Sequence, residues 1–179
     1  MAIAVANRYA RALADVVARP GDYRAVEREL EDFVAVYRRS AELRDLFETP
    51  AVPLEEKKKV LEVILARLET SKTSANFLRI VLTNYRMRAL EEIVQTFRKI
   101  ANQRLGVVQV KVFSAESLRE SARRAVSARF EEVTGKRVEM EFHEQAELLG
   151  GILAQIESTV YDGSVRGHLQ RIRQRLMGE

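Results

Sequence analysis

The sequence of 179 residues contains no cysteine. This absence excludes disulfide bonds, thiolate catalysis and metal sites built on thiolates. Histidine is scarce as well, because His143 and His168 are the only two and neither has a second histidine at ligand spacing. We therefore expect no metal site and no cofactor.

Long apolar runs are also missing. Runs such as Ile152-Leu153-Ala154 are far shorter than the ~20 residues that cross a membrane. No basic stretch followed by an apolar run opens the chain, so no secretory signal is expected. Residues 3–17, which include Asp15, instead continue the pattern of a folded helix.

The composition that remains is typical of a globular protein. Hydrophobic residues make up 46% and charged residues 31%, which suffices for a buried core. The net charge of +4 comes from residues 1–105, with 19 basic and 15 acidic side chains, because residues 106–179 carry 11 of each. This small excess does not require a nucleic-acid partner.

Glycine divides the chain into two halves. Of the eight glycines, only Gly21 precedes residue 106. Glycine marks turns and helix ends, so the first half is expected to form long helices and the second half shorter, mixed elements. We place the domain boundary at Leu105-Gly106 and predict two domains, 1–105 and 106–179.

The first half is predicted to be a bundle of six helices. Apolar residues recur there at helical spacing, as in Val26, Leu30 and Phe33. Ser40 is a candidate N-cap and Pro53 a candidate first-turn residue. The expected helices span 3–18, 23–39, 41–48, from 53 to about 68, 73–84 and 89–105.

The second half has the period of strands. Apolar residues alternate with polar ones in 108–112 and 138–142. A third strand is expected over 152–160, a helix from Ser114 to Gly135, and a turn at 161–164. The last helix carries apolar and basic faces: Val165, Leu169, Ile172 and Leu176, with Arg166, Arg171, Arg173 and Arg175. The predicted fold class is mainly α, a six-helix bundle followed by a small α+β domain.

The first and fifth helices carry more apolar surface than a bundle helix needs. The first has two apolar stripes, one through Ala10 and Leu13 and the other through Tyr9 and Ala12. The fifth has almost no polar face around Ile80. Two interpretations stay open: both helices are wholly buried, or they lie side by side and leave an apolar groove for a partner helix.

Catalytic patterns are weak. Ser114 and His143 could be parts of a triad, but no nucleophile-elbow glycines flank the serine, and a helix cap is favoured. The pair Gly150-Gly151 is not followed by the Lys-Ser/Thr of a phosphate loop. The acidic residues around 139–147 and Lys57-Lys58-Lys59 are interpreted as solvated faces. We therefore expect a binding protein and not an enzyme.

Several segments together resemble one family. The segment Ala6-Asn7-Arg8-Tyr9-Ala10-Arg11-Ala12-Leu13 resembles the start of the δ subunit of F-type ATP synthase, whose mitochondrial counterpart is the oligomycin-sensitivity-conferring protein. Residues 76–84, followed by Arg86 and Leu90, resemble that family's fifth helix. Residues 110–115, 149–152 and 162–165 with Leu169 resemble its C-terminal part, so the resemblance covers the chain in order.

This resemblance implies a non-catalytic role. In the family, the first and fifth helices bind the N-terminal helix of the ATP synthase α subunit, and the C-terminal domain binds the C-terminal region of the b subunits. The chain would then be a stator subunit that resists rotational torque and meets the membrane only through the complex. Carried over to this sequence, the groove residues are Tyr9, Ala12 and Ile80, extended by helical spacing to Val5, Val16, Asn76 and Thr83.

One alternative from another class remains, a basic, helical regulator that binds nucleic acid. It would need a recognition helix with exposed basic and amide residues, and the first and fifth helices are too apolar for that. The resemblance instead implies no nucleic-acid partner. The lack of a targeting peptide favours a bacterial protein at the cytoplasmic face of the cell membrane.

Overall fold

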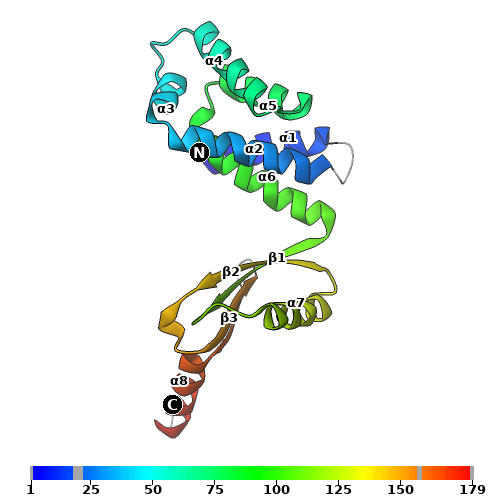
Figure 1. Cartoon of the computed structure of the whole chain (residues 1–179), viewed down its shortest axis with the longest axis vertical. Helices are drawn as coiled ribbons and strands as arrows, with labels where there is room; N and C mark the ends of the chain where they lie inside the picture. The colour runs from blue at the N-terminus through cyan, green and yellow to red at the C-terminus, as the bar shows by residue number, and fades with distance from the viewer. Residues whose placement is uncertain (1, 18–21, 157–158, 178–179) are drawn as a thin grey trace. The chain divides into compact units, whose positions relative to one another are not determined.

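The computed structural model describes residues 2–17, 22–156 and 159–177 (Figure 1). The chain forms two units, Met1–Leu105 and Gly106–Glu179. Helices dominate and a small sheet lies in the second unit, which confirms the mainly α class. The end of the helix predicted over 3–18 lies outside the described residues at residue 18. None of the described helices is both long and apolar enough to cross a membrane.

Helices make up the first unit. Local signals begin two of them, because the Ser40 hydroxyl accepts a hydrogen bond from the Leu43 amide at 3.1 Å and the Ser71 hydroxyl accepts one from the Ser74 amide at 3.4 Å. The helices of this unit are α1 (Ala2–Val16), α2 (Asp22–Arg39), α3 (Ala41–Glu48), α4 (Leu54–Arg67), α5 (Lys72–Thr83) and α6 (Leu90–Leu105), with a 3-10 turn η1 (Met87–Ala89) before α6.

The core of the first unit is built around α6. Helices α1 and α2 both pack against α6. Leu30 and Phe33 of α2 and Phe97 of α6 are fully buried in this core. The Tyr23 hydroxyl donates a hydrogen bond to the Ala14 carbonyl at 2.9 Å, which ties the start of α2 to the end of α1. One face of α1 is thereby fixed in the core.

The second unit is a four-stranded sheet with helices. Its elements are β1 (Val107–Ser114), α7 (Glu120–Thr134), β2 (Arg137–Glu144), a 3-10 turn η2 (Ala146–Leu148), β3 (Gly151–Ile156), β4 (Thr159–Ser164) and α8 (Val165–Met177). The strand order is β2-β1-β3-β4, with β1 parallel to β2 and the other pairs antiparallel. Helix α7 connects the parallel pair, and its Phe130 packs against the core at Val110 and Val112.

Two predictions for the second unit are wrong. The strand expected over 152–160 is divided, because Thr159 pairs back on Ile156 and Ser164 on Gly151, so the supposed turn at 161–164 is part of β4. The sequence between the two strands, Glu157-Ser158, contains no glycine, proline or asparagine to mark a reversal. Ser114 does not begin a helix either: it ends β1 opposite Glu144, and α7 begins at Glu120.

The interpretation of the lysine run as a solvated face is wrong for Lys57. Its side chain is fully buried. The Lys57 Nζ donates hydrogen bonds to the carbonyls of Phe47 at 3.1 Å and Thr49 at 2.8 Å, where α3 ends. Lys59, on the same helix, is exposed. Lys57 is therefore a structural cation that links α4 to the end of α3.

Candidate partner-binding groove

Helix α1 presents apolar side chains on two sides. Ala10 and Leu13 are buried in the core, whereas Val16 is 67% exposed and Ala12 is also exposed. Tyr9 lies between the two sides and is half-buried. Packing on α6 therefore uses only one of the two stripes that the sequence places on this helix.

Helix α5 is also apolar beyond its buried side. Phe77, Leu78 and Val81 are buried, but Ile80 is 53% exposed and Asn76 is exposed. The alternative in which both helices are wholly buried is therefore wrong. Each helix leaves apolar surface outside the core.

The exposed sides of α1 and α5 line one groove of about 410 Å³. Five of the residues expected at a partner site line it: Tyr9, Ala12, Val16, Asn76 and Ile80. The other two lie on the same helices but outside this lining; Val5 is half-buried and Thr83 is exposed at the end of α5.

Five lining residues were not expected from the sequence: Arg8, Leu13, Lys72, Thr73 and Phe77. Leu13 and Phe77 are buried and form the floor of the groove. Helical spacing assigns them to the core, and it cannot reveal that the same side chains also face a groove. Arg8 and Lys72 are exposed.

Arg104 of α6 holds the end of the α1 wall. Its Nη1 donates to the Ala14 carbonyl at 2.6 Å and to the Tyr23 hydroxyl at 3.0 Å, while its Nη2 contacts the Asp15 carboxylate. The hydrogen bond to Asp15, followed by that to Tyr23, raises the pKa of the Arg104 guanidinium. The end of α1 is thus fixed to α6 and α2 by one side chain.

Arg79 holds the α5 wall in a similar way. Its Nε and Nη2 donate to the Glu62 carboxylate of α4 at 2.6 and 2.7 Å, and its Nη1 donates to the Asn76 side-chain oxygen at 2.8 Å. The Arg79 hydrogen bond lowers the pKa of Glu62, and the same bond raises the pKa of Arg79. Asn76 is therefore oriented at the groove before any partner arrives.

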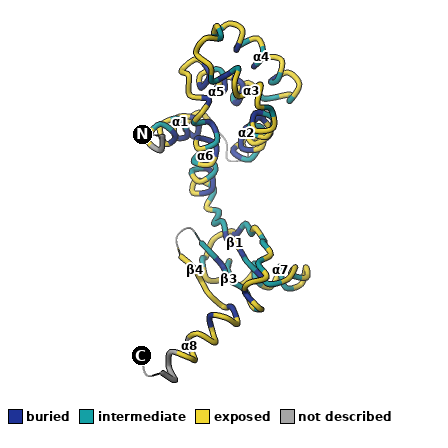
Figure 2. Tube along the Cα trace, turned by 90° about the vertical axis from the view of Figure 1, so that its left-hand side faces the viewer, coloured by how far each residue is buried: buried dark blue, intermediate teal, exposed yellow. Residues whose placement is uncertain are grey.

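The second unit has an exposed surface of its own on α8. Most of the described part of this helix is exposed (Figure 2). Val165, Leu169 and Ile172 are 46%, 56% and 41% exposed, and Arg166 and Arg173 are exposed on the same helix. The side chains of Arg171, Arg175 and Leu176 lie outside the described residues.

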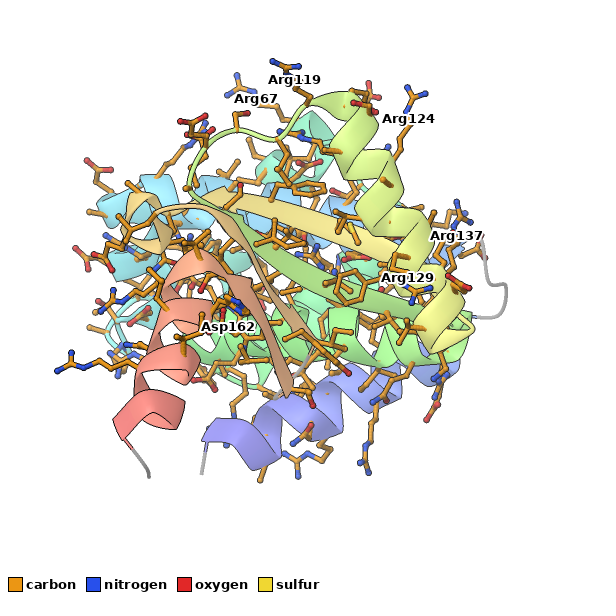
Figure 3. All side chains as sticks on the ribbon, turned by 90° about the horizontal axis from the view of Figure 1, so that it is seen from below. Arg67, Arg119, Arg124, Arg129, Arg137 and Asp162 are labelled. Carbon is orange, nitrogen blue, oxygen red and sulfur yellow. The ribbon has the colours of Figure 1, made fainter. Side chains whose placement is uncertain are left out.

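Helix α7 is also basic, but two of its arginines pair with glutamates of the same helix. Arg124 and Arg129 project from it (Figure 3). Each is paired within the helix, Arg124 with Glu120 at 3.2 Å and Arg129 with Glu132 at 2.5 Å. These arginines are partly neutralised. Because α8 exposes three large apolar side chains, Val165, Leu169 and Ile172, it is the better candidate for a protein contact.

Ser114 and His143 do not form a nucleophile and base. The buried Ser114 hydroxyl donates to the Glu116 carbonyl at 2.7 Å, so the expectation that it caps a helix is also wrong. His143 stacks on Phe113 at 5.2 Å, and its Nε2 lies 3.1 Å from Glu141. Within the described residues, no three histidine, aspartate or glutamate side chains gather as a metal site.

The groove belongs to a chain that matches one protein family over nearly its whole length. The family described as "ATP synthase delta (OSCP) subunit" matches residues 5–176. The chain belongs to this family.

Relatives within the delta (OSCP) family cover nearly the whole chain. The chain is 42% identical over 174 residues to the ATP synthase subunit delta of Acidobacterium capsulatum, covering 97% of each protein. It is 35% identical over 176 residues to that of Myxococcus xanthus, again covering 97% of each. The fold is similar to a chain in the cryo-EM structure of the Toxoplasma gondii mitochondrial ATP synthase hexamer, with a TM-score of 0.65, 22% identity and coverage of 97% and 98%.

As a member of the delta (OSCP) family, the protein is a subunit of the peripheral stalk of ATP synthase, and it is not catalytic. It is part of a membrane-associated complex. The alternative of a nucleic-acid-binding regulator has no support in these matches.

Proposed function

We propose that the α1–α5 groove binds the N-terminal helix of the ATP synthase α subunit. The observation that carries this proposal is the apolar stripe left exposed on each wall, through Val16 on α1 and Ile80 on α5. A groove between two helices fits the apolar face of an amphipathic partner helix. On this proposal the unit at 1–105 acts as a six-helix module for the catalytic head.

The strength of such a contact follows from the area that it buries. One Leu-sized side chain moved from water into an apolar site contributes roughly 1.5–3 kcal/mol. Four or five such contacts contribute roughly 6–15 kcal/mol, and association costs at least about 4 kcal/mol, so they hold a partner helix at about 10 nM at best. A stator contact needs this strength because its dissociation must be slow compared with turnover.

The second unit, 106–179, is proposed to bind the C-terminal region of the b subunits. Support comes from α8, where exposed Leu169 and Ile172 lie on one helix with exposed Arg166 and Arg173. A helix that is both apolar and basic suits a partner with apolar and acidic side chains. The chain would then tie the head to the membrane-anchored b subunits at the cytoplasmic face of a bacterial membrane and resist torque.

Calorimetric titration tests the groove. The full chain is titrated with a peptide that copies the N-terminal ~20 residues of the α subunit of the same complex. We expect tight one-to-one binding, weakened at least about 30-fold by Ile80→Asp, which places a charge in the groove. Tyr9→Asp should weaken it similarly.

The matched control is Val63→Asp. Val63 is 67% exposed on α4 and lies outside the groove lining, so this variant should bind the peptide like the wild type. Unchanged binding by a folded Ile80→Asp variant would mean that the helix binds elsewhere. No binding by the folded wild type would remove the proposal itself.

A further inference from the structure

The α1–α5 groove is lined by two charged side chains, and both are basic. Arg8 comes from α1 and Lys72 from α5, and each is the first lining residue of its helix. Both are exposed. A helix seated in the groove therefore meets a positive charge from each wall.

These two cations differ from the arginines that hold the walls. Arg79 and Arg104 are paired with Glu62 and Asp15. Over the described part of the chain, neither Arg8 nor Lys72 forms an ion pair; the Arg8 guanidinium lies over the Tyr9 ring at 5.6 Å. Their charges are thus available to a partner.

The position of Lys72 is not explained by helix stability. The helices α2, α3, α4 and α6 each carry an acidic residue in the first turn. The two helices of the groove, α1 and α5, carry none, and α5 begins with Lys72. The N-terminal end of a helix is positive, so a lysine there is unfavourable. A carboxylate from a partner would remove this penalty.

We propose that the groove selects an acidic amphipathic helix, whose apolar face fills the channel and whose flanking carboxylates meet Arg8 and Lys72. This inference rests on the proposed function, in which the groove binds the α-subunit helix, and it adds the charge that this helix must carry. Rim charges of this kind speed association and exclude basic helices more than they increase affinity.

The test compares two peptides. One copies the N-terminal ~20 residues of the α subunit of the same complex, and the other has every carboxylate side chain replaced by the matching amide. At low ionic strength we expect the acidic peptide to bind the full-length wild type about tenfold more tightly, with most of the excess in the association rate. Salt at about 0.5 M should remove most of this difference.

Variants locate the effect. The double variant Arg8→Gln/Lys72→Gln should bind both peptides about equally. The control Arg11→Gln/Lys59→Gln removes the same number of positive charges from exposed positions outside the groove lining, and it should keep the tenfold preference. The control thereby separates the groove from the net charge of the protein.

The outcomes are distinct. Charge selection would be overturned, with the groove assignment left intact, by any of three results. The α-subunit helix has no carboxylates beside its apolar face, the wild type binds the two peptides equally, or both double variants lose the same affinity. Failure of the unmodified peptide to bind the folded wild type would instead overturn the proposed function, and this inference with it.

Discussion

The buried ammonium group of Lys57 closes the end of α3. Its two hydrogen bonds go to the carbonyls of Phe47 and Thr49. Lys57→Met keeps most of the side-chain stem and leaves both carbonyls without this donor, so we expect the free energy of unfolding to fall by about 2–3 kcal/mol. Denaturant unfolding followed by circular dichroism measures the change. Lys59→Met, on the exposed side of α4, should cost less than about 0.5 kcal/mol; equal losses would contradict the role of Lys57.

The hydrogen bond between Tyr37 and Glu48 should make the stability of the fold sensitive to acid. The Tyr37 hydroxyl donates to Glu48 at 2.7 Å. This bond, with a smaller contribution from Arg88, lowers the pKa of Glu48, while burial, followed by the same bond, raises the pKa of Tyr37. Because the folded pKa of Glu48 lies below its ordinary value of 4.5, its stabilisation is complete above that pH and is lost as the pH falls through the folded pKa.

Glu48→Gln should therefore flatten the loss of stability between about pH 5 and pH 3, and cost about 1 kcal/mol near neutral pH. Unfolding curves over that pH range measure both effects. Glu56→Gln, at an exposed position of α4, is the control that should leave the pH dependence of the wild type. An unchanged slope in Glu48→Gln would show that other carboxylates carry the acid sensitivity.

Residue-scale prediction from the sequence succeeds where the signal is local. Ser40 is recognisable as the cap of α3 because its hydroxyl bonds an amide three residues away. The burial of Lys57 is not recognisable, because the carbonyls that it meets belong to the preceding helix end. The role of Arg8 and Lys72 at the groove is not recognisable for a related reason. They line the same groove only once α1 and α5 have packed in the fold.

At the scale of elements, Gly151, the first residue of β3, allows β3 and β4 to approach each other closely. Its φ is +75°, and a Cβ there would lie 2.4 Å from the Gly163 carbonyl oxygen on β4. Gly151→Ala should therefore destabilise the β3–β4 pair by more than about 2 kcal/mol. Gly135→Ala is the control, because Gly135 has a similar φ of +63° and no atom near its Cβ position, and it should cost about 1 kcal/mol.

Hydrogen exchange of the β3 and β4 amides in the full chain measures this difference. Faster exchange confined to these strands in Gly151→Ala is the expected result. If both glycine variants exchanged alike, close approach to Gly163 would not be the reason for the glycine.

At the same scale, periodicity predicts elements better than it predicts pairing. The alternation of Val108, Val110 and Val112 correctly indicates β1, and the double apolar stripe of α1 correctly indicates surface beyond the core. The reversal that makes β4 has no such signal, since no glycine, proline or asparagine lies between Ile156 and Val160. Which faces meet is decided by contacts distant in sequence.

For the whole molecule, the two cores share no residue. The core of the first unit and the side chains packed on it run from Ala6 to Leu105, and those of the second run from Val108 to Ile156. We therefore expect residues 1–105 to fold alone and to bind the α-subunit peptide within about twofold of the full chain. Residues 106–179 should keep any binding to the C-terminal region of the b subunits. Calorimetric titration of each fragment with its partner peptide measures the binding. If residues 1–105 alone were unfolded, the two units would not be independent domains.

The Arg104 contacts also determine how the first unit bears load. Tension that enters along the backbone at Gly106 reaches the C-terminal end of α6, the place from which a helix peels most easily. Arg104, two residues away, ties that end to Ala14, Asp15 and Tyr23. A pull on the chain therefore has to break the Arg104 contacts with α1 and α2 before this end of α6 can separate from them.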